Sequence, residues 1–245
     1  MSDVGVIGQK FRDAARALES PKMGTEAVAP LLYDLVMLHR PRRILEVGGG
    51  LSTLYLLKAL ADSTMRGEAE RGLIEQGGVE QEGSLLDPVY HNVLPRPAQL
   101  HMIDNLVHAN TTAGKVIEVA RSLGIDAPLR VHEADFIGYA DKLPKDEPPF
   151  DMVWFDCGTI EYFQHFRRAY WPLVSRNGGL ILIHSLATNF HGQMFLSELK
   201  LEQATKSFSD FELLTLIEPH KRRQNSVTMV RLTGTLHTQI HSVMP

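Results

Sequence analysis

The fold of this chain is constrained most by residues 43–57, which read RILEVGGGLSTLYLL. The short apolar run 44–47 leads into three glycines and then into apolar residues at helical spacing, a pattern that predicts a strand, a tight turn and a helix N-terminus. Gly48 and Gly50 let the backbone turn sharply and let a ligand approach closely. Because a helix N-terminus offers free N–H groups and partial positive charge, the turn is expected to bind a nucleotide-like ligand.

The spacing of the glycines distinguishes two classes of nucleotide-binding turn. A dinucleotide fingerprint has glycine at its first, third and sixth positions. Counted from Gly48, the sixth position is Thr53. The spacing therefore disfavours a nicotinamide dinucleotide, although an NAD-dependent enzyme on a similar fold remains an alternative.

Apolar periodicity predicts an alternation of strands and helices along the rest of the chain. Alternating strands and helices form a parallel sheet covered on both faces, whereas the short connection before the last strand requires an antiparallel pair. The expected fold is an α/β, Rossmann-like doubly wound seven-stranded sheet, mostly parallel with an antiparallel last strand. Strands are expected at 44–47, 100–104, 129–132, 150–156, 180–184, 211–217 and 226–232, and helices at 8–20, 26–39, 51–62, 111–123, 162–174 and 194–207.

The whole chain, 1–245, is expected to form a single domain. Its N-terminal helices, within 1–40, are expected to lie over the cofactor site. The segment 63–99 is an insert, which is unusual because most connections are short. Its glycine- and glutamate-containing first half is expected to be a flexible or helical excursion. The second half is expected to be better ordered, near the active-site rim or in a subunit contact, so a homodimer is possible.

The glycine turn resembles motif I of the class I S-adenosyl-L-methionine (SAM)-dependent methyltransferases. The resemblance lies in Glu46, Gly48, Gly50, Ser52 and Thr53. Four further segments carry the resemblance: PKMGTE at 21–26, PRRILEV at 41–47, FDMVWFDCG at 150–158 and GGLILIH at 178–184. Through them the resemblance extends to the catechol and caffeoyl-CoA O-methyltransferase-like branch and to related bacterial small-molecule methyltransferases. It implies that Glu46, Gly48, Gly49, Gly50 and Ser52 hold SAM.

Polar residues at the predicted strand ends fit the same cofactor. In a doubly wound sheet, ligands bind beyond the carboxyl ends of the strands. Asp104 could accept both ribose hydroxyls, and Asp135 could accept the adenine amino group. Together with Glu46 and Asp156, these carboxylates would favour the positively charged sulfonium and ammonium groups.

One departure from that branch bears on the mechanism. Its metal-dependent members have an aspartate at the end of strand 4 and an Asp-Asn pair at the end of strand 5, which are oxygen ligands suited to Mg²⁺. This chain has Asp156 but His184 and Ser185 at the second place, so no metal is expected. A softer transition-metal site from Asp156, His184 and His191 is the alternative.

General-base catalysis is the stronger hypothesis for His184. Methyl transfer from a sulfonium is an in-line displacement, and its nucleophile gains reactivity by losing a proton to a group that titrates near neutrality. The predicted catalytic residues are His184 and Asp156, with Asp156 or Glu161 orienting the imidazole. Cys157 is expected to be a buried small residue, and Tyr162, Phe163 and Phe166 either line a substrate pocket or belong to the core.

Composition narrows the remaining classes of function. The formal net charge of −4 disfavours a dedicated nucleic-acid binder. The single cysteine excludes an internal disulfide, and no apolar run approaches the length of about 18 residues that a membrane span needs. The N-terminus has no signal-type apolar core, so a cytoplasmic location is expected.

The sequence therefore predicts a SAM-dependent methyltransferase acting on an oxygen or nitrogen of a small-molecule acceptor. Three alternatives remain: the NAD-dependent enzyme, an aminopropyltransferase-like enzyme, and a non-catalytic SAM-binding protein. An aminopropyltransferase also uses a Gly-Gly-Gly turn but would require acidic residues directly after it, where Leu51, Ser52 and Thr53 stand.

Overall fold

A mixed seven-stranded sheet forms the centre of the molecule, and its strands follow the order β3-β2-β1-β4-β5-β7-β6. The computed structural model describes residues 7–19, 24–75, 97–107, 111–144, 146–157, 160–205, 210–218 and 225–234. The strands are β1 (Arg43–Val47), β2 (Gln99–Asp104), β3 (Leu129–Glu133), β4 (Met152–Phe155), β5 (Leu180–His184), β6 (Phe211–Glu218) and β7 (Asn225–Leu232). β7 pairs antiparallel with both β5 and β6, and the other pairs are parallel. The expected fold class is confirmed.

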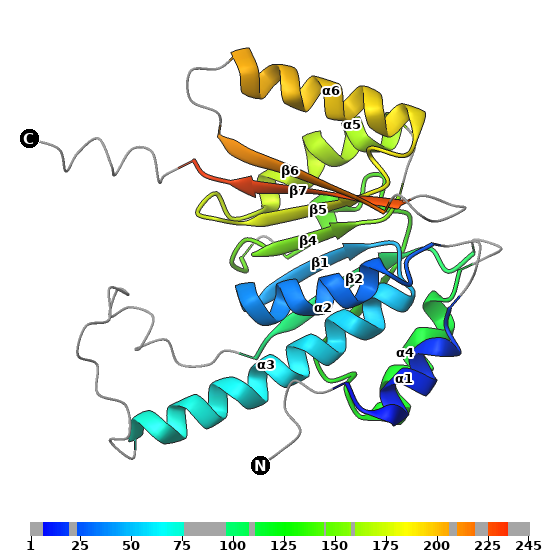
Figure 1. Ribbon diagram of the computed structural model, residues 1–245, viewed down its shortest axis with the longest axis vertical. Coiled ribbons are helices and arrows are strands. Elements are labelled where there is room, and N and C mark those ends of the chain that lie inside the picture. The colour runs from blue at the N-terminus through cyan, green and yellow to red at the C-terminus, as the bar shows by residue number, and fades with distance from the viewer. Residues whose placement is uncertain are drawn as a thin grey trace, which may run out of the picture.

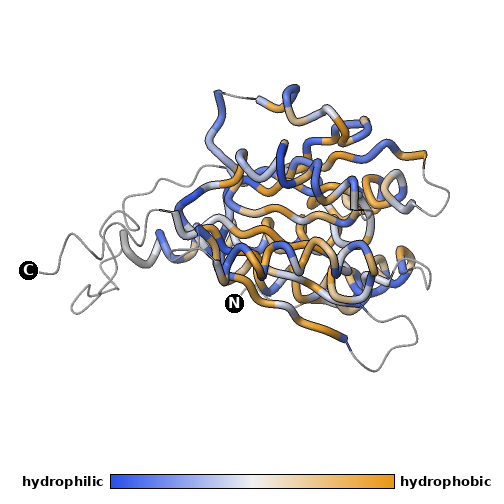
Figure 2. The backbone as a smooth tube through the Cα atoms, turned by 90° about the horizontal axis from the view of Figure 1, so that it is seen from above, coloured by the Kyte–Doolittle hydropathy of each residue, from blue (hydrophilic) through white to orange (hydrophobic). Residues whose placement is uncertain are grey.

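Helices cover both faces of the sheet (Figure 1). They are α1 (Gln9–Arg16), α2 (Val28–His39), α3 (Leu51–Glu75), α4 (Ala113–Leu123), α5 (Ile160–Ala169) and α6 (Phe190–Thr205). The apolar sides of α1 to α4 pack on one face in one core, and α5 and α6 pack on the other face in a second core. The hydrophobic colour in Figure 2 follows the central strands and the helix sides turned toward them. None of the helices in the described residues is long and apolar enough to cross a membrane.

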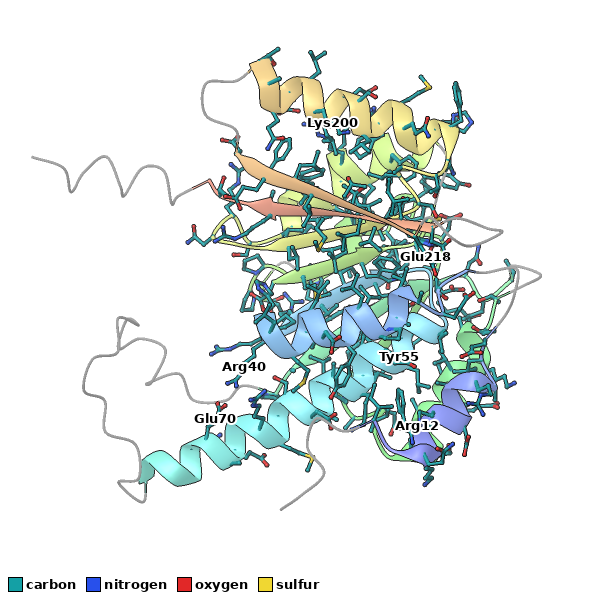
Figure 3. The ribbon with its side chains drawn as sticks, viewed as in Figure 1. Arg12, Arg40, Tyr55, Glu70, Lys200 and Glu218 are labelled. Carbon is teal, nitrogen blue, oxygen red and sulfur yellow. The ribbon has the colours of Figure 1, made fainter. Side chains whose placement is uncertain are left out.

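Most elements lie within two residues of their expected bounds, α1 ends and α6 begins four residues earlier than expected, and α3 and α5 differ more. α3 continues to Glu75, beyond the expected end at 62, so the first part of the insert is helical. Good helix formers such as Glu68, Ala69 and Arg71 support this extension, and Arg40 at the end of α2 forms two hydrogen bonds of 2.6 Å with Glu70 (Figure 3). The rest of the insert up to 96 lies outside the described residues.

The helix expected at 162–174 is divided in two. α5 ends at Ala169, and Trp171 lies in a separate 3-10 turn, Trp171–Leu173, that contains Pro172. A proline cannot donate the hydrogen bond that continues an α-helix, so the chain changes direction here.

The strand order places the candidate site. β1 lies between β2 and β4, and the order of the sheet reverses at β1 and β4. In open α/β sheets, the crevice beyond the carboxyl ends of the strands at this switch point is where ligands bind. The loops after β1, β2, β3 and β4 therefore surround the predicted cofactor site.

Candidate active site

The glycine turn after β1 is shaped by close packing against the protein itself. Gly48 has φ +91°, and a Cβ atom there would lie 2.9 Å from the carbonyl oxygen of Asp156. A Cβ atom on Gly49 would overlap the sulfur of Met102 on β2. Backbone with positive φ and such close approaches require glycine. A sharp turn and close ligand approach were the expected reasons for Gly48 and Gly50, and contacts within the protein add a reason for Gly48 and for Gly49.

Asp104 at the end of β2 holds the turn in place. One of its carboxylate oxygens accepts a hydrogen bond of 2.8 Å from the Gly49 N–H, and the other accepts one of 2.6 Å from the Leu106 N–H. A carboxylate oxygen has two lone pairs, so each can accept a further hydrogen bond. Asp104 thus supports the glycine turn and keeps acceptor capacity for a ligand.

Glu46 lies behind the turn, outside the cavity lining, and is fully buried. One carboxyl oxygen accepts a hydrogen bond of 2.6 Å from Ser52 Oγ, and the other has no hydrogen-bond partner among the described residues. Burial raises the pKa of Glu46 to about 8; the Ser52 and Thr53 hydroxyls oppose that rise, and Asp156 and Asp104 add to it. A carboxyl group with this pKa is mostly neutral at pH 7.

A cavity of about 400 Å³ opens beside the turn. Five of the predicted site residues line it, whereas Glu46, Gly50, Ser52 and His184 do not. The lining consists of Val47, Gly48, Gly49, Ile103, Asp104, Asn105, Thr111, Ala134, Asp135, Phe136, Asp156, Cys157 and Tyr162.

The cavity favours positive charge. Its described lining contains three aspartates and neither lysine nor arginine. Burial, followed by the negative charges of Asp156, Asp135 and Asp104, raises the pKa of the Cys157 thiol to about 12. The thiol is therefore protonated near neutral pH and is a poor nucleophile.

His184 lies next to Asp156, outside the described lining of the cavity, and is paired with it. Its Nδ1 is 2.6 Å from Asp156 Oδ1, and its ring lies 5.7 Å from the ring of the fully buried Trp154. The His184 side chain is 9% exposed and that of Asp156 is 22% exposed. Glu161, the other expected partner, has an exposed position on α5.

The alternative metal site is not assembled. Among the residues that the structure describes, no group of three or more His, Cys, Asp and Glu side chains could hold a metal ion. His191 is exposed on α6, and its ring packs against Phe190.

Several lining residues were not singled out from the sequence. Phe136 packs edge-on against Tyr162 at 5.4 Å, and together they form an aromatic wall of the cavity. Phe136 directly follows Asp135. An aromatic residue next to a strand-end acid is therefore the sequence feature that could have identified Phe136 as a cavity residue. Met102 supports the glycine turn from β2, and no sequence pattern distinguishes it from other apolar strand residues. Phe163 and Phe166 are core residues.

Fold and site together define a class: the chain has the fold of the class I SAM-dependent methyltransferases. The O-methyltransferase TomG from Streptomyces achromogenes, solved in complex with SAM, matches with a TM-score of 0.61 and 18% identity over 93% of this chain and 91% of that one. An O-methyltransferase from Bacillus cereus in complex with S-adenosylhomocysteine (SAH) matches with a TM-score of 0.61 and 13% identity over 94% of each chain.

A third structure shows the same likeness. The SAH-bound methyltransferase PaMTH1 from Podospora anserina matches with a TM-score of 0.55 and 15% identity over 92% of this chain and 88% of that one. No protein-family model matches the chain, and no curated protein matches its sequence. The resemblance noted in the sequence is thus confirmed at the level of the fold.

Proposed function

We propose that this protein is a metal-independent SAM-dependent methyltransferase that transfers a methyl group to an oxygen or nitrogen of a small-molecule acceptor. The observation that carries the proposal is the cavity at the switch point, which combines the glycine turn with three aspartates. SAM carries a positive sulfonium, and carboxylates near it favour that charge. Of the three solved structures named above, two were solved with SAH and one with SAM.

Each aspartate has a distinct proposed role. Asp104 accepts hydrogen bonds from the ribose hydroxyls with the lone pairs that Gly49 and Leu106 leave free. Asp135, whose carboxylate also accepts the Ile137 N–H at 2.8 Å, lies beside the adenine. Asp156 faces the sulfonium end and links it to His184.

The proposed chemistry is an in-line displacement assisted by His184. As the acceptor atom attacks the methyl carbon, the carbon–sulfur bond breaks, its electron pair stays on sulfur, and SAH leaves as a neutral thioether. The proton of the acceptor passes to His184, and Asp156 stabilises the resulting imidazolium. The cavity reaches Asp156 and not His184, so the acceptor has to enter beside Asp156.

Cofactor binding gives the first prediction. Titration calorimetry is expected to detect SAM and SAH binding, and Asp104→Asn is expected to weaken both by about 1.5 to 3 kcal/mol, the range for a hydrogen bond to a charged group. Asp126→Asn, at an exposed acid that pairs with Arg121 at 3.9 Å, is the matched control. Binding of NAD or decarboxylated SAM in place of SAH would instead identify an oxidoreductase or an aminopropyltransferase.

Metal removal gives the second prediction. An acceptor is first found by mass spectrometry, from the mass of one methylene that it gains. Its methylation is expected to survive exhaustive EDTA treatment and not to increase with Mg²⁺. The reason is that His184 stands where the metal-dependent branch has an oxygen ligand. Loss of activity on chelation, restored by a single divalent ion, would contradict metal independence.

A further inference from the structure

A second and larger cavity lies at the opposite edge of the sheet. Its volume is about 610 Å³, and it opens at the amino ends of β1, β2, β4 and β5. It is lined by the turn between α2 and β1, at 39–43, and by residues directly before the other three strands. β1 has five residues, so about 13 Å of extended chain separates this cavity from the glycine turn. Methyl transfer makes no use of it.

Arginines dominate the turn that lines this cavity. Arg40, Arg42 and Arg43 all line it. Arg40 is engaged by Glu70 on α3, and the two side chains face each other in Figure 3. Arg43 is largely buried, pairs with Glu147, and lies 4.5 Å from the ring centroid of Phe150. These two guanidinium groups are therefore held by the protein itself.

The two acids in the lining are engaged as well. Asp151 Oδ2 accepts hydrogen bonds from the backbone N–H groups of Arg42, at 2.8 Å, and Arg43, at 3.0 Å. Glu147 is paired with Arg43. Among the described residues, the half-buried Arg42 guanidinium has neither an ion-pair partner nor a hydrogen-bond acceptor. The five N–H donors of Arg42 are therefore left without a protein acceptor at the cavity wall.

We propose that this cavity binds a small organic anion that carries a carboxylate or a phosphate group, with Arg42 as its principal contact. A cation would find Glu147 already paired with Arg43, and one oxygen of Asp151 already bonded by two backbone N–H groups. A wholly apolar ligand would leave the guanidinium without an acceptor in a partly desolvated place, which is unfavourable. The volume exceeds that of a bare ion, and prolines 41, 97 and 148 provide apolar wall for an organic part.

The test uses inorganic phosphate and succinate as probes, titrated against the full chain at an ionic strength held constant with chloride. The binding of phosphate and the binding of succinate are measured separately by calorimetry, so the two kinds of anion are distinguished. Arg42→Gln is expected to weaken the binding of the preferred probe about tenfold or more, since a hydrogen bond to a charged group contributes about 1.5 to 3 kcal/mol. The variant keeps the backbone contact with Asp151, so its melting temperature is expected to match that of the wild type.

Arg66→Gln is the matched control, because Arg66 is an exposed arginine of α3 outside the cavity, 3.6 Å from Glu70. It is expected to bind the probe as the wild type does. The proposal is overturned if neither probe binds more tightly than chloride, if Arg42→Gln binds as well as the wild type, or if SAH displaces the probe. SAH binding to Arg42→Gln is measured in parallel, so a failure of this proposal is distinguishable from a failure of the proposed methyltransferase function.

Discussion

For single residues, the bond between His184 and Asp156 has the clearest chemical consequence. An ionised carboxylate only accepts hydrogen bonds, so Nδ1 of His184, which lies 2.6 Å from Asp156 Oδ1, carries the proton. In a neutral imidazole, Nε2 then holds the lone pair and is the basic atom. The pair therefore fixes the tautomer that the proposed general base requires, whereas Nε2 itself is buried and the described cavity ends at Asp156.

The third prediction tests this base. His184→Asn is expected to lower turnover about 10²- to 10⁴-fold, the usual contribution of a positioned base, while SAM affinity stays nearly unchanged. The asparagine amide can still donate a hydrogen bond to Asp156 but cannot take a proton. The wild-type rate is expected to rise with pH as the proposed base loses its proton, and the variant is expected to lose that rise.

A variant that keeps the pH-dependent rise and loses less than about tenfold in turnover would contradict the assignment. Such a result would leave proximity and orientation as the main source of catalysis, as expected for an acceptor that is already a good nucleophile.

For pairs of elements, α2 and α3 are joined by a buried polar contact within the apolar core. The hydroxyl of Tyr33 donates a hydrogen bond of 2.7 Å to Asp62, and Lys58 contacts the same carboxylate at 2.5 and 2.7 Å. Burial, followed by the hydrogen bond to Asp62, raises the pKa of Tyr33. The carboxylate is therefore satisfied by one partner from each helix, which fixes how the two helices pack.

The fourth prediction concerns this contact. Tyr33→Phe is expected to lower the free energy of unfolding by about 0.5 to 1.5 kcal/mol, because it removes one hydrogen bond and leaves Lys58 to neutralise Asp62. Tyr55→Phe is the control, since Tyr55 packs edge-on against Phe11 at 5.0 Å and its hydroxyl has no hydrogen-bond partner among the described residues. Equal denaturation midpoints for Tyr33→Phe and the wild type would show that the contact adds nothing to stability.

For the whole molecule, two buried groups give stability opposite dependences on pH. Burial raises the pKa of Glu46 from 4.5 to about 8, so its contribution is fully present below pH 4.5 and is lost as the pH rises through 8. Burial, followed by the positive charges of Arg43 and His132, lowers the pKa of His101 from 6.5 to about 4. Its contribution is present above pH 6.5 and is lost as the pH falls through 4.

The fifth prediction follows from these opposite signs. The free energy of unfolding without ligand, measured by chemical denaturation from pH 4 to 9, is expected to fall toward both ends of the range. Glu46→Gln is expected to flatten the alkaline decline and His101→Phe the acid decline, each by a few kcal/mol, because one unit of pKa difference corresponds to about 1.4 kcal/mol. Parallel curves for a variant and the wild type would show that the replaced group does not titrate differently on folding.

The order and type of most elements could be predicted from the sequence. Short apolar runs and the glycine turn mark β1, β2 and β5 within one residue of their observed bounds. The sequence left open whether the first half of the insert was flexible or helical, and α3 extends into it as the continuation of a helix that is packed on the sheet. The positions of Asp104 and Asp156 at strand ends could also be predicted from the sequence. Strands that alternate with helices run parallel, so their carboxyl ends lie at the same edge of the sheet.

The sequence by itself determined the fold class, the edge of the sheet that carries the site, and the set of strand-end acids, because these follow from periodicity and chain order. Only the tertiary structure decided which side chains meet. Gly49 is excluded from bearing a side chain by Met102, which lies on another strand. His184 pairs with Asp156 although 28 positions separate them, and Asp151 accepts the backbone N–H of Arg42 while the Arg42 guanidinium has no acceptor among the described residues. Such contacts depend on packing between segments that are distant in the chain, and local sequence patterns carry no information about them.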